Sequence, residues 1–111
     1  MDEEEAILSS LIDWVAEILP IDFNHEISNK QLRIFRGSEW SEHADSRLSI
    51  SIKEEGIVID GNLIIWSRDD IQREFQRSVL VGITKIDPSV MFNNPKFAES
   101  WRHIITQDVS R

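Results

Sequence analysis

The sequence contains no cysteine, and this absence excludes disulfide bonds, thiolate zinc sites and cysteine nucleophiles together. It also has no apolar run long enough to cross a bilayer. The opening residues Met1-Asp2-Glu3-Glu4-Glu5 are acidic, whereas a secretory signal peptide begins with basic residues. We therefore expect a cytoplasmic protein that does not bind membranes.

Motifs for phosphate binding and nucleophilic catalysis are also missing. The chain has no Walker A sequence, no GxGxxG and no nucleophile elbow. None of its histidines, His25, His43 and His103, forms an HxH or HExxH pair. Glu99 and His103 could share a helix face, but two ligands do not make a metal site. The sequence thus predicts no catalytic residues, no metal and no other cofactor, and we expect a protein that is not an enzyme.

Lysine and arginine are absent from the first 29 positions. Residues 1–45 hold eleven acids and three bases, whereas residues 46–111 hold nine of each. The whole net charge of −8 therefore lies in the first part of the chain. Such a field repels nucleic acid and anionic membranes and attracts basic macromolecules. We expect a basic protein partner and no direct contact with nucleic acid.

What the sequence does contain is enough apolar material for one core. Its 111 residues are 41% hydrophobic and include four tryptophans. A chain of this length buries well over half of its unfolded surface when it folds alone. We predict a single domain over residues 1–111.

Apolar residues recur at helical spacing in the first segment and predict a helix over residues 3–19, which Pro20 ends. The acids of its first turn suit the positive end of the helix dipole. Asp13 and Glu17 have no such explanation, because they are like charges four residues apart toward the negative end. They are therefore candidate partner-binding residues.

Alternating apolar residues predict an antiparallel meander over residues 47–53, 57–60 and 62–66. The dipeptide Asp60-Gly61 is a strong signal for a hairpin turn. A strand over residues 31–36 could extend this sheet, and residues 21–30 are interpreted as a polar connection.

Two further helices are predicted after the meander. Ser67 is expected to cap the first of them, and Gly82 to end it, although residues 78–83 could instead form a strand. Asn94 and Pro95 favour the start of the second helix. The fold class is thus α+β, with an antiparallel sheet of three to four strands and an N-terminal helix and two C-terminal helices packed against it.

Trp40 lies within the polar stretch GSEWSEHADS and has two interpretations. It could fold back as a lid on the sheet or on the first helix. It could instead anchor a partner, while Glu39, Glu42 and Asp45 meet that partner's Lys and Arg residues. The tryptophans at positions 14, 66 and 101 lie in periodic apolar segments and are expected in the core.

Paired acids occur at two further places, Glu54-Glu55 in a turn and Asp69-Asp70 at a helix start. Both positions favour acids for structural reasons. An acid and base pair in catalysis would need partial burial and perturbed pKa values. We include Glu54 and Glu55 among the candidate partner-binding residues.

Small size, acidity and the absence of cofactor motifs favour an inhibitor of a nuclease, since carboxylates can occupy a cleft built for phosphates. At the level of size, acidity and α+β layout, the chain resembles the immunity proteins of bacterial toxin systems, including those of contact-dependent growth inhibition. This resemblance implies a nuclease toxin as partner, with a ribonuclease ahead of a deoxyribonuclease. No family motif is matched, so no functional residue is transferred.

Two alternatives remain open at this point. One is a small enzyme or ligand-binding domain whose pocket holds a carboxylate and a histidine. The other is an acidic regulatory adaptor, for example an anti-activator of a basic transcription factor. The acidic surface would be the same for the adaptor and for an immunity protein.

Overall fold

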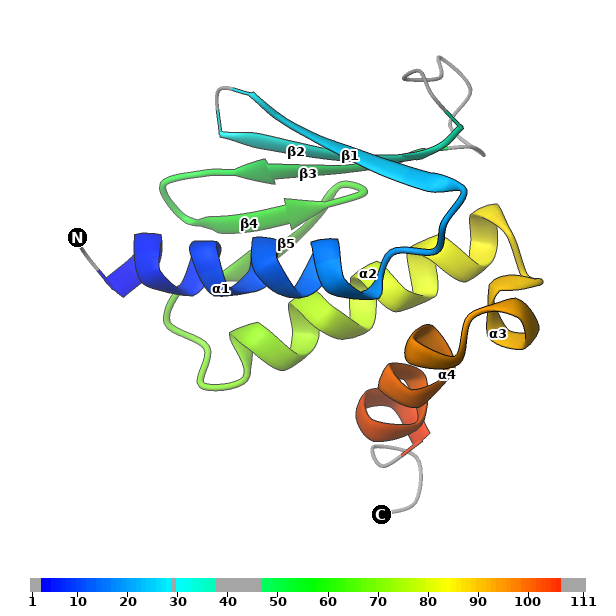
Figure 1. Cartoon of the computed structure of the whole chain (residues 1–111). Coiled ribbons are helices and arrows are strands. Elements are labelled where there is room, and N and C mark those ends of the chain that lie inside the picture. Colours follow the sequence, from blue (N-terminus) through cyan, green and yellow to red (C-terminus); the bar gives the residue numbers. More distant parts are fainter. Residues whose placement is uncertain (1–2, 29, 38–46, 107–111) are drawn as a thin grey trace.

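The computed structural model describes residues 3–28, 30–37 and 47–106, and its helices cover one face of an antiparallel sheet (Figure 1). The elements, in chain order, are α1 (Glu3–Ile18), β1 (Phe23–Ser28), β2 (Gln31–Arg36), β3 (Arg47–Ile52), β4 (Gly56–Ile59), β5 (Asn62–Ile65), α2 (Ile71–Ile86), α3 (Val90–Asn93), α4 (Pro95–Trp101) and the π-helical η2 (Arg102–Thr106). The predicted α+β class is confirmed, with five strands in place of three to four.

The sheet is a simple meander in the order β1-β2-β3-β4-β5, and each strand pairs antiparallel with the next. The predicted strands from residue 31 onward are confirmed within one residue at each end. Asp60 and Gly61 both have positive φ angles, 49° and 82°. This backbone matches the type I′ turn that joins tightly paired strands.

The interpretation of residues 21–30 as a connection was wrong, because β1 occupies most of this segment. β1 pairs with β2 over six residues, from Phe23 opposite Arg36 to Ser28 opposite Gln31. An edge strand buries little, and Phe23 is the buried side chain among those of β1 that the structure describes. The apolar alternation on which strand prediction depends is therefore weak here.

The core lies between the sheet and the two long helices. α1 contributes buried residues at helical spacing, and α2 contributes a buried stripe with a four-residue period. The sheet contributes the alternate residues of β2 to β5 that face the helices. The core side chains of the helices and of these strands are Leu11, Val15, Ile18, Leu32, Ile34, Leu48, Ile50, Ile57, Ile59, Ile64, Ile71, Phe75, Val79, Leu80, Ile83, Val90 and Phe97.

Both predicted ends of α2 were wrong. The helix begins after Asp70 rather than after Ser67, and the Asp70 carboxylate is bound by Arg68 at 2.8 and 2.9 Å instead of capping the helix. Gly82 does not end the helix, which continues to Ile86, so residues 78–83 are helical. Gly82 is buried where α2 packs closely on Leu48 of β3.

The start of α4 is confirmed. The Asn94 side chain accepts a hydrogen bond from the Phe97 backbone N–H at 3.0 Å, and Pro95 occupies the first turn. Helical structure continues through η2 to Thr106. The short helix α3 was not predicted. α3 and α4 lie beyond the carboxyl end of α1 (Figure 1).

The three tryptophans expected in the core are each half-buried and pack against it. Trp14 meets Phe75 edge-to-face at 6.5 Å between ring centroids, and Trp66 and Trp101 are half-buried against the same core. The Trp66 indole N–H donates to the Lys53 carbonyl at 3.1 Å. Within the described ranges no helix combines the length and apolar character required to span a bilayer.

Candidate functional site

The solvent-facing side of α1 carries acids separated by small residues. It lies opposite the buried stripe, and from residue 5 onward its exposed members are Glu5, Ala6, Ser9, Ser10, Asp13, Ala16 and Glu17. The residues between the acids are alanine and serine, so no long side chain shields the carboxylates. We call this surface the acidic face of α1.

Asp13 and Glu17 lie one helical turn apart on this face and are both exposed. Neither carboxylate has an ion-pair or hydrogen-bond partner among the described residues. Two like charges at this spacing cost about 0.2–0.5 kcal/mol. The last turn of α1 holds no basic residue that would offset the cost. These two predicted site residues are thus together and available to a partner.

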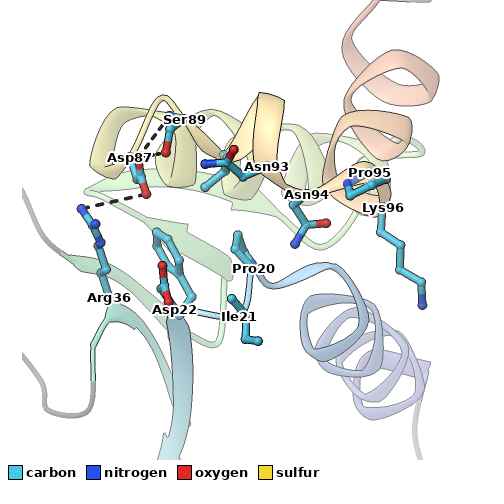
Figure 2. A pocket seen from close by; sticks show the side chains of 12 residues that line it. Pro20, Ile21, Asp22, Arg36, Asp87, Ser89, Asn93, Asn94, Pro95 and Lys96 are labelled. Atoms are coloured by element: carbon cyan, nitrogen blue, oxygen red, sulfur yellow. Dashed lines mark hydrogen bonds and ion pairs between the residues drawn. The ribbon is translucent and has the colours of Figure 1, made fainter.

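A groove of about 560 Å³ opens where α1 ends. Pro20, Ile21 and Asp22 form one wall as the chain leaves the helix, and the segment from α2 to α4 forms the other (Figure 2). The rest of its lining consists of Phe23, Arg36, Asp87, Ser89, Val90, Asn93, Asn94, Pro95 and Lys96.

Asp87 lies at one side of this groove, next to Ser89 and Arg36 (Figure 2). Its carboxylate accepts hydrogen bonds from the Ser89 hydroxyl at 2.7 Å and from the Ser89 backbone N–H at 3.1 Å. The guanidinium of Arg36 lies 3.9 Å away. The Ser89 hydrogen bonds, with a smaller contribution from the charge of Arg36, lower the pKa of Asp87. Asp87 is therefore ionised at neutral pH, and its ion pair with Arg36 links the end of α2 to β2.

Two large apolar side chains are almost fully exposed at this end of the molecule. Ile21, on the groove wall, is 96% exposed, and Phe92, on α3, is 87% exposed. Ile21 follows Glu17 by four residues and precedes the exposed Asp22. Exposed apolar area therefore lies just beyond the carboxyl end of α1.

The turn acids Glu54 and Glu55 are exposed, as predicted for a turn, but they lie elsewhere. Glu54 lines a separate hollow of about 590 Å³ together with Glu5, Lys30 and Lys53. This hollow adjoins the first turns of α1, whereas Asp13 and Glu17 lie in the second half of the helix. The structure thus separates the turn acids from Asp13 and Glu17, and it places Glu54 beside two lysines.

The remaining predicted partner-binding residues, Glu39, Trp40, Glu42 and Asp45, lie outside the described residues, as does His43. The two interpretations of Trp40 both stay predictions.

Within the described ranges, little in the structure supports catalysis or metal binding by a histidine. His103 is exposed, and its Nε2 lies 3.8 Å from Oε1 of Glu99, which is also exposed. His25 is half-buried on β1. No group of three His, Asp or Glu residues in the described ranges could hold a metal ion. Histidine does not line the two hollows described above or three others elsewhere on the described surface.

Sequence reasoning missed the groove and its exposed Ile21. An isoleucine next to a helix-ending proline, in a segment interpreted as polar connection, was a usable indication of it. The contribution of Asp87 could not be read from sequence, because its partner Arg36 is distant along the chain.

Comparisons of the chain with protein-family models, with curated proteins and with solved structures gave no match. The function therefore has to be argued from the surface itself.

Proposed function

We propose that this chain binds and neutralises a basic protein in the cytoplasm, most concretely a nuclease toxin, as an immunity protein does. A ribonuclease is the first candidate and a deoxyribonuclease the second. The proposal includes no catalytic step and no cofactor.

One observation carries this proposal, the pair of exposed carboxylates at Asp13 and Glu17. They repel each other, and no described residue neutralises them. The small residues around them let another surface approach closely. A partner that brings Lys or Arg side chains to this face would relieve the repulsion. Binding would then regain the free energy that this repulsion costs the folded protein.

The mechanism follows from charge complementarity. A nuclease must carry a cationic cleft for phosphates, and carboxylates presented there compete with the nucleic acid. The field of the acid-rich first part of the chain accelerates encounter, and its effect weakens as salt screens it. Ile21 would add desolvated apolar contact beside the charged residues.

The test is co-purification of the tagged protein from its native host at low salt. The captured polypeptide is identified by mass spectrometry and assayed for nuclease activity before and after separation. We expect a basic polypeptide whose nuclease activity appears only after separation. Capture of no basic polypeptide would contradict the proposal.

Charge-reversal variants of the tagged protein test whether the acidic face of α1 is the surface that binds the partner. Asp13→Lys and Glu17→Lys, made singly, should each weaken binding of the captured partner about tenfold, through the loss of one attractive charge and the gain of a repulsive one. Asp69→Lys is the matched control, because Asp69 is exposed, has no described partner and lies outside α1. Equal effects of all three variants would mean that net charge, not this surface, determines binding.

The segment containing Glu39, Glu42 and Asp45 is tested in the same assay. Reversing these three charges together should weaken binding by several kcal/mol if they form the centre of the interface. An unchanged affinity would remove this segment from the proposed interface.

A further inference from the structure

β1 lies at one end of the sheet, and the direction of its backbone groups can be assigned. The Gly37 N–H donates to the Asp22 carbonyl at 2.8 Å, which places Asp22 in the hydrogen-bonded set facing β2. In an antiparallel pair this set comprises alternate residues. The backbone groups of His25 and Ile27 therefore point away from β2, toward the outer edge.

These outward groups have no described partner. The outward N–H of Phe23 is satisfied by the Pro20 carbonyl at 2.9 Å, at the start of the strand. His25 and Ile27 have no such bond within the described residues, and no described strand lies beyond β1. Both residues can accept another strand.

β1 also lacks the usual protection of edge strands. Proteins shorten exposed edges, interrupt them with bulges, or place Pro and Lys on them. β1 is six residues long, contains neither Pro nor Lys, and pairs one-to-one with β2 without a bulge. The opposite edge, β5, has four residues, and the Ile65 carbonyl accepts a bond from the Arg68 N–H at 3.2 Å.

The charges on and next to β1 indicate which kind of strand can pair with its outer edge. Asp22 and Glu26 are exposed, and Glu26 forms no ion pair with a described residue. A second copy would offer a β1 with the same single acid, Glu26, and no Lys or Arg, so it would bring no attractive charge, and Glu26 opposite Glu26 would be destabilising. A cationic strand gains attraction at the same positions.

We propose that β1 pairs with an extended cationic segment of the partner, which adds to the sheet as a further antiparallel strand. Lys or Arg would lie opposite Glu26, and an apolar residue opposite Ile27, which is 54% exposed. This inference rests on the proposed function for the existence of a basic partner, and it adds how that partner is recognised.

The probe is a short blocked peptide of alternating lysine and valine, titrated into the full chain and followed by amide NMR shifts. We expect changes in the amide chemical shifts of residues 23–28 and slower amide hydrogen exchange at His25 and Ile27. The same peptide with glutamate in place of lysine should leave these amides unchanged. Shifts confined to α1, or no shifts in β1, would overturn the proposal. Concentration-dependent changes in β1 without peptide would overturn it in favour of a second copy.

Two proline variants test the edge itself. Ile27→Pro removes an outward N–H and leaves the bonds to β2 in place, and edge strands tolerate such prolines. Leu63→Pro is the matched control on β5, since Leu63 is 50% exposed and the strand is the opposite edge. Only Ile27→Pro should abolish the β1 shifts; equal loss in both variants would contradict edge pairing.

A charge swap keeps the test decisive if a proline variant does not fold. Glu26→Lys should weaken the lysine peptide about fivefold and create binding of the glutamate peptide. No change in preference would overturn the proposal. If β1 fails these tests while Asp13→Lys still weakens capture of the nuclease, the proposed function stands and only the edge is excluded.

Discussion

Gly82 of α2 faces Leu48 of β3 so closely that a β-carbon at position 82 would lie 2.9 Å from Cδ1 and 3.1 Å from Cδ2 of Leu48. Both residues are buried. The absence of a side chain at position 82 therefore allows the helix to pack closely on the sheet. This packing explains why a residue of low helix propensity lies within α2.

Gly82→Ala is expected to lower the free energy of unfolding by about 1 kcal/mol. Overpacking a core costs about 1–3 kcal/mol, which exceeds the gain of about 1 kcal/mol in helix propensity. Urea denaturation followed by tryptophan fluorescence measures the change. In a Leu48→Ala background, the same substitution should instead stabilise the protein, because the contacted methyl groups are gone. Equal destabilisation in both backgrounds would show that Leu48 is not the cause.

Asn94→Ala should cost about 1 kcal/mol in the free energy of unfolding, the usual value for a lost N-cap. The cap is the hydrogen bond from the Phe97 N–H to the Asn94 side chain. Asn93→Ala is a matched control, since Asn93 is exposed and has no described hydrogen bond from its side chain. Thermal and urea unfolding of the two variants should differ clearly, and similar losses would argue against the cap.

The lowered pKa of Asp87 predicts a loss of stability in acid. A group with a lowered folded pKa contributes its full stability above its unfolded pKa and loses it as pH falls through the folded pKa. Asp87→Asn should therefore be less stable than the parent above about pH 5, with a difference that shrinks toward lower pH. Urea denaturation across this range measures it. A difference that stays constant with pH would show that the charge of Asp87 does not contribute.

Glu17→Gln should raise the free energy of unfolding by about 0.3–0.5 kcal/mol, because it removes repulsion with Asp13 and a negative charge near the carboxyl end of α1. The gain should shrink in high salt, which screens exposed charges. The same variant should bind the captured basic partner more weakly. Higher stability combined with weaker binding is the outcome that a binding surface predicts. Unchanged binding would remove Glu17 from that surface.

Most of the fold was predictable because the apolar periods of its helices and strands involve residues that are close together in the sequence. The alternation in β3 and the helical spacing in α1 and α4 each depend on neighbours in the sequence. β1 was missed because an edge strand with exposed Asn24 and Glu26 has no clear apolar period. The end of α2 was misplaced because a glycine required by packing on Leu48 looks the same in sequence as a helix stop.

The candidate site was predictable only in part. Asp13 and Glu17 stood out because like charges on one helix face conflict with local stability, and sequence spacing shows this directly. The position of Ile21 next to Pro20 was the one local indication of the groove, whose second wall depends on α3 and α4 reaching the end of α1. Glu54 was grouped with the other acids by charge alone, whereas its place beside Lys30 depends on how two turns meet.

The strictly sequential order of the sheet also bears on how quickly the chain can fold. Every strand finds its partner in the strand that directly precedes or follows it, so the loops closed during folding are mostly short. α1 is the exception, since α2, against which it packs, begins more than fifty residues after α1 ends. We therefore expect the sheet and α2 to assemble before the helix bearing Asp13 and Glu17 docks on them.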